Sequence, residues 1–159
     1  MAINEETIFD TLNKVDVSEH IEKKGRFNYL SWPWAWAEVK KRYPAAEWKA
    51  YQQDNGVPYI TDGRYCWVKV GVKIGMIENI EIYPVTDNTN RSIPVDKVTS
   101  FEINTAIQRA MVKAIARHGL GLYIYAGEDL PESAKDEKKP IEQMSEEDFN
   151  EVVNNGKSN

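Results

Sequence analysis

The sequence contains few of the residues that build disulfides or metal sites. Cys66 is the single cysteine among 159 residues, which excludes an internal disulfide and a cysteine-rich zinc site. The two histidines, His20 and His118, lie far apart, so the chain has no His-x-x-x-His pair of metal ligands. A chain of this length buries about 70% of its unfolded surface and needs no such cross-link to fold. The sequence therefore predicts one ordinary folded domain without a metal.

Long apolar runs are also missing. No stretch approaches the ~20 apolar residues that a membrane-spanning helix needs. The N-terminal segment carries Glu5, Glu6 and Asp10, whereas a signal peptide begins with positive charge followed by an apolar run. We therefore expect a soluble protein of the cytoplasm.

Motifs of catalysis are absent as well. The sequence has no Walker-type glycine loop, no Gly-x-Ser-x-Gly elbow and no Asp-x-Asp metal pair. His118 precedes a glycine at a predicted helix end, where an imidazole satisfies helix-end carbonyls, and Cys66 alternates with valines as a small core residue. We expect solvated surface carboxylates at strand exteriors and turns, namely Asp62, Glu78, Glu81, Asp87 and Asp96. The sequence predicts a protein that is not an enzyme and uses no cofactor.

The net charge of −5 conceals an uneven distribution. Residues 1–127 carry sixteen Lys and Arg against fifteen Asp and Glu, a net charge of +1, whereas residues 128–159 carry ten acids against four lysines. The second segment is also rich in polar residues and contains two prolines, which is typical of a disordered interaction tail. We predict a working domain over 1–127 and an acidic flexible tail over 128–159, with a short helix at 145–154.

The first third of the domain predicts two helices. Apolar residues from Ile3 to Val15 have the spacing of a short amphipathic helix, and the polar residues 22–26 are typical of a loop. Ser31 suits the N-cap of a helix over 32–43 that ends before Pro44. Its core face is predicted to hold Trp32, Trp36, Val39 and Tyr43. Trp34 falls on another face and is the exposed candidate for base stacking or a subunit contact.

The remaining elements predict an α+β domain. Residues 47–51, 65–74 and 77–85 have the period of two that indicates three antiparallel strands, with the second and third forming a hairpin. Thr99 and Glu102 form a capping box for a long helix that ends before Gly119. The apolar residues 120–125 are predicted to return to the sheet as a short final strand. The order is helix, three-stranded antiparallel sheet, long helix packed on the sheet, short strand.

Basic residues alternate with aromatic residues on the central strand. Trp67, Lys69 and Lys73 share its outward face, and Arg64 precedes it. Sheet faces of this kind hold single-stranded nucleic acid, because bases stack on the rings and phosphates meet the cations. The alternative is that a helix covers Trp67 and that the lysines only make the edge of the sheet soluble.

The long helix carries a second basic group. Arg109, Lys113 and Arg117 are spaced four apart and project together on one stripe, with Gln108 beside them. Like charges at this spacing repel each other unless an anion lies alongside, although many such stripes are solvated faces. Residues 40–42 are also basic, but cations at a helix C-terminus are favoured by the helix dipole alone.

These segments resemble a known family. The Tyr29-Leu-Ser-Trp-x-x-Ala-Trp-Ala37 segment, the three strands and the helix ending Arg-His-Gly-Leu-Gly-Leu-Tyr123 are similar to phage Sak-type single-strand annealing proteins. The strand–strand–strand–helix order more distantly resembles the eukaryotic Rad annealing recombinases and phage Red-beta and Erf. The resemblance covers residues 5–127 and leaves the acidic tail outside the shared domain.

The resemblance implies ATP-independent binding of single-stranded DNA and annealing of complementary strands during phage recombination in a bacterial host cell. It implies rings or filaments whose partners are single-stranded DNA, further copies of the chain, and a host or phage single-strand binding protein. It places phosphate-binding cations at Arg109, Lys113 and Arg117, and on the central strand at Lys69 and Lys73.

Two other functions stay open from the residues alone. One is a small interaction module that binds a host protein through the Trp-rich helix and the acidic tail. The other is an enzyme acting on nucleic acid or nucleotides, which would need carboxylates that converge in space.

Overall fold

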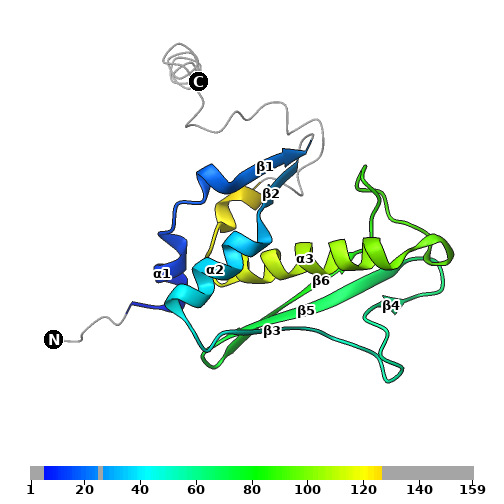
Figure 1. The fold of residues 1–159 in the computed structure, drawn as a ribbon, viewed down its shortest axis with the longest axis horizontal. Helices are drawn as coiled ribbons and strands as arrows, with labels where there is room; N and C mark the ends of the chain where they lie inside the picture. Colours follow the sequence, from blue (N-terminus) through cyan, green and yellow to red (C-terminus); the bar gives the residue numbers. More distant parts are fainter. Residues whose placement is uncertain (1–5, 25–26, 127–159) are drawn as a thin grey trace, which may run out of the picture. The chain divides into compact units, whose positions relative to one another are not determined.

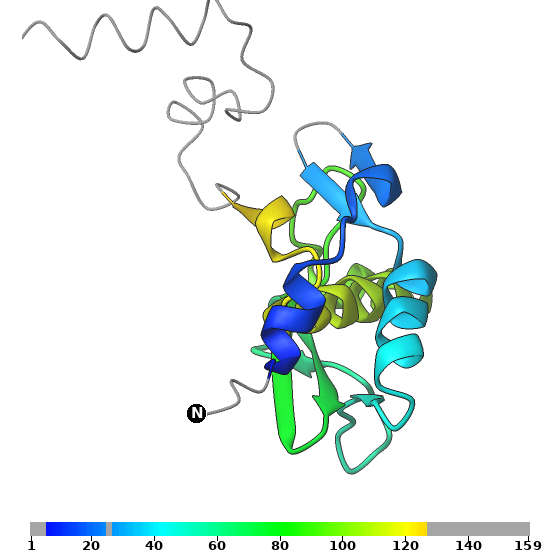
Figure 2. The same ribbon diagram turned by 90° about the vertical axis from the view of Figure 1, so that its left-hand side faces the viewer.

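The α+β class predicted from the sequence is confirmed in a computed structural model, which describes residues 6–24 and 27–126 (Figure 1). In chain order the elements are α1 (Ile8–Asn13), η1 (Ser18–His20), β1 (Ile21–Lys24), β2 (Phe27–Leu30), α2 (Trp32–Arg42), β3 (Glu47–Ala50), β4 (Ile60–Thr61), β5 (Cys66–Ile74), β6 (Ile77–Pro84), η2 (Val95–Lys97), α3 (Ser100–Arg117) and η3 (Leu122–Tyr125). Figures 1 and 2 both place α3 between the main sheet and the β1–β2 hairpin.

The main sheet is built on β5, as the alternation of its residues predicts. Strand β6 pairs antiparallel with one edge of β5, while β3 and β4 both pair with the other edge. The inward side chains of β5, which are Cys66, Val68, Val70, Val72 and Ile74, are at most 1% exposed. Because side chains alternate between faces, Trp67, Lys69 and Lys73 lie on the opposite face, called the outer face below.

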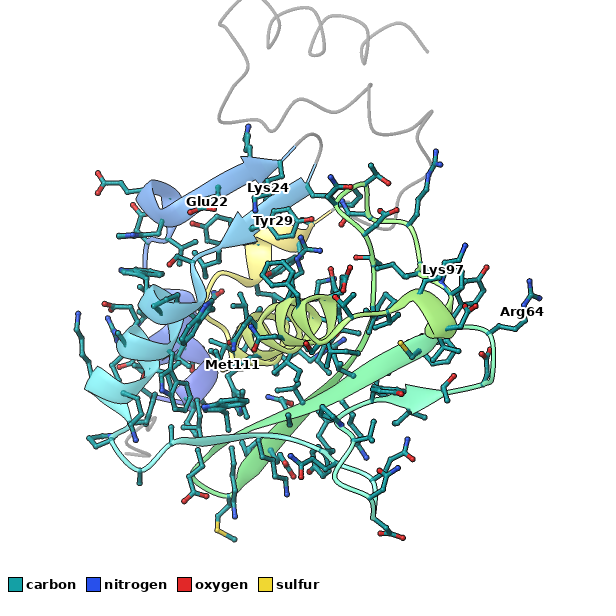
Figure 3. All side chains as sticks on the ribbon, turned by 45° about the vertical axis from the view of Figure 1, so that its right-hand side comes forward. Glu22, Lys24, Tyr29, Arg64, Lys97 and Met111 are labelled. Carbon is teal, nitrogen blue, oxygen red and sulfur yellow. The ribbon has the colours of Figure 1, made fainter. Side chains whose placement is uncertain are left out.

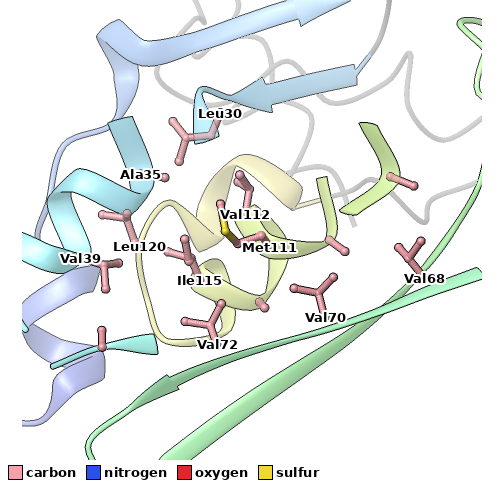
Figure 4. Close-up of a cluster of buried hydrophobic side chains, with 14 of the residues drawn as sticks. Leu30, Ala35, Val39, Val68, Val70, Val72, Met111, Val112, Ile115 and Leu120 are labelled. Carbon is pink, nitrogen blue, oxygen red and sulfur yellow. The ribbon is translucent and has the colours of Figure 1, made fainter. Parts of the chain in front are cut away.

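Helix α3 covers the inner face of this sheet. It begins with the predicted capping box, in which the backbone N–H of Thr99 donates to Glu102 Oε2 at 2.9 Å. Ala110, Met111 and Ile115 are at most 1% exposed and complete the apolar core with the valines of β5 (Figure 4). Gly119 ends the helix at φ 120, and an added Cβ there would lie 2.6 Å from the backbone oxygen of Phe9. The glycine therefore both reverses the chain and lets α1 approach.

Helix α2 forms as predicted, and three residues of its predicted core face pack on the core, since Val39 is fully buried and Trp36 and Tyr43 are half-buried against it. Trp32 is the exception. Ala35 and Val39 are fully buried, and α2 packs on α3, whereas Trp32 is 43% exposed and is not a core residue. Trp34, expected to be exposed, is half-buried because the His20 ring stacks on it at 4.1 Å between centroids. The period of a helix groups residues by face, but it does not say which face meets another element.

Three other segments differ from the expectation. Strand β4 adds a fourth strand to a sheet that was predicted to have three. Residues 21–24 and 27–30 form the paired strands β1 and β2, with Glu22 opposite Tyr29, whereas a polar loop was predicted over 22–26. The predicted final strand is the 3-10 helix η3, because Gly119 and Gly121 both adopt positive φ and bend the chain before it. Alternating Gly and Leu residues imitate the period of a strand. The predicted tail and its helix at 145–154 lie outside the described residues.

No helix in the described ranges is long and apolar enough to cross a membrane.

Candidate nucleic-acid interface

The cations predicted to bind nucleic acid lie on two different faces of the molecule. Lys69 and Lys73 project from the outer face of the sheet, whereas Arg109, Lys113 and Arg117 lie on α3, which covers the inner face. Figure 3 shows the hairpin residues Lys24 and Tyr29 above α3, and Arg64 projecting away at the far end of the sheet. The two basic groups that the sequence predicted therefore lie on separate faces.

Arg109 packs on an aromatic ring from the hairpin. Its guanidinium carbon lies 4.6 Å from the centroid of the Tyr29 ring, and the Lys24 Nζ lies 5.7 Å from the same centroid. Arg109 also donates weakly, at 3.5 Å, to Thr86 Oγ1 and to Asn90 Oδ1. Both acceptors are neutral, so these contacts orient the guanidinium without neutralising it.

Lys113, one helical turn further along α3, lies between two other tyrosines. Its Nζ is 5.2 Å from the centroid of Tyr125 and 5.3 Å from that of Tyr83. Tyr83 comes from the inner face of β6, and Tyr125 comes from η3, so three separate segments meet here. We call Tyr29, Tyr83, Tyr125, Lys24, Arg109 and Lys113 the helix-side cluster. Arg109 and Lys113 were expected to be exposed, but both are half-buried because these rings cover them.

Arg117, the third residue of the basic stripe, has an acidic partner. Its Nε donates to Glu81 Oε2 at 2.5 Å, and this hydrogen bond and charge raise the pKa of Arg117. Glu81 was expected to be a solvated carboxylate, but its side chain is only 11% exposed because residue 81 faces α3. The ion pair compensates Arg117, which is therefore less available to a phosphate than Arg109, whose hydrogen-bond acceptors are neutral.

On the outer face, a tyrosine is flanked by two lysines and bonded to a carboxylate. Lys49 and Lys69 place their Nζ atoms 4.4 and 4.6 Å from the Tyr51 centroid. The Tyr51 hydroxyl donates to Glu78 Oε1 at 2.6 Å. A Cβ at Gly71 would collide with Glu78 and come within 3.2 Å of Tyr51, so the glycine allows both side chains to lie across the strand.

Carboxylates accompany the other outer-face lysines too. Lys73 is directly opposite Glu47 on β3 and Glu78 on β6, and Glu78 lies 3.9 Å from Lys49. Opposite charges in such cross-strand pairs attract each other. The outer face is therefore close to neutral around its lysines.

The remaining predicted residues lie toward the β4 end of the sheet. Trp67 is half-buried between its cross-strand neighbours Ile60 on β4 and Pro84 on β6. Arg64 is exposed in the turn before β5, and its guanidinium lies 5.6 Å from the Tyr65 centroid. Exposed apolar side chains accompany Trp67 here, with Ile60 at 44% and Ile82 at 58%.

Neither buried reactive group is placed for catalysis. Cys66 is 1% exposed, and burial raises the pKa of its thiol, as expected for a core residue. His118 donates from Nε2 to the Val72 carbonyl oxygen at 2.8 Å, and burial lowers its pKa. It therefore satisfies a sheet carbonyl rather than the helix-end carbonyls that we expected. Within the described residues, no group of three or more His, Cys, Asp or Glu side chains could hold a metal ion.

Sequence reasoning missed the aromatic half of the helix-side cluster. Tyr29, Tyr83 and Tyr125 lie far apart in the chain, on β2, β6 and η3, so no spacing in the sequence connects them. The signal that was available was Tyr29 itself, which begins the Tyr-Leu-Ser-Trp segment.

Comparison with protein families agrees with this chemistry. The family model described as Sak Single Strand Annealing Protein matches residues 7–159. The chain belongs to the Sak family of single strand annealing proteins. The match extends through the acidic tail, so the expectation that the tail lies outside the shared domain was wrong. No curated protein and no solved structure matches the chain.

Membership in the Sak family makes annealing of single strands the general activity of this chain. The helix-side cluster combines the two chemical groups that this activity needs, since rings stack with bases and cations meet phosphates.

Proposed function

We propose that this Sak-family protein binds single-stranded DNA along the helix-side cluster and anneals complementary strands without ATP. The observation that carries the proposal is the placement of Arg109 and Lys113 over tyrosine rings at 4.6 to 5.3 Å, with neutral hydrogen-bond acceptors around Arg109. A strand can replace these ring contacts with phosphate contacts and stack its bases on the exposed parts of the rings.

The energetics of annealing need no nucleotide. Duplex stacking contributes about 1.4 kcal/mol per base-pair step, so pairing itself supplies the free energy once two strands meet. The protein contributes phosphate neutralisation and an extended strand with accessible bases. The absence of a Walker-type loop in the sequence supports this passive, non-enzymatic mechanism.

Several copies of the chain are needed to hold a useful length of DNA strand. One cluster offers three cations, which suits only a few nucleotides, and the domain over 1–127 carries a net charge of just +1. A ring or filament of copies would join the clusters into a continuous basic surface. We propose that such an assembly acts in phage homologous recombination in the cytoplasm of the host cell, alongside a host or phage single-strand binding protein.

The outer-face residues Lys69, Lys73, Trp67 and Arg64 remain predictions with a smaller proposed role. Lys73 lies opposite Glu47 and Glu78, which compete with phosphates for it, and Lys69 lies over the Tyr51 ring, whose hydroxyl is bonded to Glu78.

The decisive experiment is annealing of two complementary fluorescent oligonucleotides over a protein titration without ATP. We expect the wild-type chain to accelerate pairing, and the Arg109→Ala/Lys113→Ala variant to lose most of this acceleration. Lys69→Ala/Lys73→Ala is the matched control, because it removes the same number of cations from the outer face. A wild-type protein that neither binds nor anneals single strands would overturn the proposal, and equal losses in both variants would overturn the site.

A further inference from the structure

The loop between β6 and η2 has an ordered backbone although it lies outside the main sheet. The N–H groups of Asp87, Asn90 and Ile93 donate to the carbonyls of Arg91, Asp87 and Val85, respectively. The Asp87 carboxylate accepts hydrogen bonds from the Thr89 hydroxyl and from the backbone N–H groups of Thr89 and Arg91, and these bonds lower its pKa. The loop is therefore a rigid support beside the helix-side cluster.

Asn90, at the end of this turn, has an uncommon backbone conformation. Its φ is 61, and it is the single non-glycine residue with positive φ among the described residues. Asparagine tolerates this left-handed conformation better than most residues, but glycine adopts it with less strain. Replacing Asn90 by glycine would therefore keep this backbone conformation and remove only the side-chain amide.

The amide oxygen of Asn90 contacts two different elements. The Tyr29 hydroxyl donates to Asn90 Oδ1 at 3.0 Å, and Arg109 reaches the same oxygen at 3.5 Å. One amide oxygen thus joins β2 and α3, the two elements that supply the stacked Tyr29 ring and guanidinium. The second acceptor of Arg109, Thr86, belongs to the same loop.

We infer that Asn90 is a positioning residue for nucleic-acid binding: it holds the Tyr29 ring and the Arg109 guanidinium in the stacked geometry that receives the strand. This inference rests on the proposed function. Asn90 acts through Tyr29 and Arg109 and does not itself need to contact DNA. Without the amide oxygen, Arg109 keeps its charge but loses its fixed place above the ring.

The test uses the full chain and Asn90→Gly, which keeps the left-handed backbone and removes the amide. We expect affinity for a fluorescent oligothymidine to fall about three- to tenfold, as for the loss of one or two hydrogen bonds. Because the charge of Arg109 remains, the salt slope should stay at its wild-type value, whereas Arg109→Ala should make it shallower by about 0.7. Asn88→Gly, at an exposed position of the same loop, is the matched control and should bind like wild type.

A second variant separates positioning from general loop stability. Tyr29→Phe keeps the ring and removes the donor to Asn90, so it should weaken binding by a similar factor. The double variant Tyr29→Phe/Asn90→Gly should then be no weaker than either single variant, because both remove the same link. Wild-type affinity in Asn90→Gly, or additive losses in the double variant, would overturn the inference. A large drop in thermal midpoint that Tyr29→Phe does not share would show a purely structural role and also overturn it. If wild type itself fails to bind, the proposed function fails instead.

Discussion

The two faces of the main sheet carry similar residues in different electrostatic settings. On the α3 side, Arg109 and Lys113 lie over tyrosines, and the hydrogen-bond acceptors of Arg109 are neutral. On the outer face, Lys49 and Lys69 also lie over a tyrosine, but that tyrosine is bonded to Glu78. A lysine beside a ring is therefore not sufficient to mark a phosphate site. Arg109 lies among neutral acceptors, whereas Glu78 lies 3.9 Å from Lys49 and directly opposite Lys73.

The two faces also differ in how they are assembled. The helix-side cluster joins residues from β1, β2, β6, α3 and η3, so it exists only in the folded chain. The outer face is made by adjacent strands, and α3 leaves it uncovered (Figure 1).

The largest expected effect comes from removing two cations from the helix-side cluster. Arg109→Ala/Lys113→Ala should weaken binding of single-stranded DNA at low salt by about tenfold or more, uniformly across sequences, because phosphate contacts dominate such binding. Its salt slope should become shallower by about 1.4, at about 0.7 for each phosphate contact. Fluorescence anisotropy over a salt series measures both quantities. An unchanged salt slope would show that these cations do not contact phosphates.

A comparison of one tyrosine from each face should give the next largest effect. Tyr29→Ala removes a ring that we expect to stack with a base, a contribution of about 1–3 kcal/mol, so affinity should fall at least fivefold. Tyr51→Ala removes the equivalent ring on the outer face, where Glu78 accepts its hydroxyl. We expect that change to alter affinity less than about twofold, as for a residue outside the binding surface. Equal losses in anisotropy titrations would place the strand on both faces.

Removing a carboxylate should increase binding on the helix side. Glu81→Gln leaves Arg117 with a neutral partner at the end of the basic stripe, so affinity for single-stranded DNA should rise by about two- to threefold at low salt. The gain should shrink as salt rises. The comparison variant is Glu47→Gln, which removes a carboxylate opposite Lys73 on the outer face. A larger gain in affinity from Glu47→Gln would indicate that the DNA binds to the outer face instead.

The smallest effect on binding should come from a lower pH, which reduces the stability of the folded domain that carries both faces. Burial lowers the pKa of His118, so the unfolded chain binds its proton more tightly than the folded chain does. The free energy of unfolding should therefore decrease as the pH falls below about 6.5, the ordinary histidine value, and the loss is complete below the lowered pKa of the folded state.

Thermal denaturation at pH 7.5 and 5.5 (about two pH units apart, spanning the ordinary histidine pKa) measures this effect. His118→Gln retains a donor for the Val72 carbonyl but cannot be protonated, so its midpoint should depend less on pH than that of the wild type. A midpoint with the same pH dependence in both proteins would show that His118 does not carry it.

Local patterns predicted the central elements well. The alternation of valines in 66–74 predicts β5 and its buried face, and the capping box with Gly119 predicts α3 to within a residue at each end. The one-stripe geometry of Arg109, Lys113 and Arg117 also follows from their spacing alone. These features depend on residues within a few positions of each other, where the geometry of helix and strand is fixed.

The errors came where distant segments meet. Trp32 was predicted to be a core residue, yet it is 43% exposed, whereas the smaller Ala35 of the same helix is fully buried. Trp34 is covered by His20, a residue of the preceding segment. Strand β1, which pairs with β2, carries mostly polar side chains, so its sequence alone looks like a loop.

The sequence by itself determined the α+β class, the strand β5, the helix α3 and the family to which the chain belongs, because these depend on periodicity, capping and local motifs. Only the tertiary structure decided which cations lie beside carboxylates. Arg109 and Arg117 occupy equivalent positions two turns apart on one helix, but the loop at Asn90 brings neutral oxygens to the first and β6 brings Glu81 to the second. Whether a cation is already neutralised depends on partners that are distant in the chain, and the spacing of residues in the sequence does not reveal those partners.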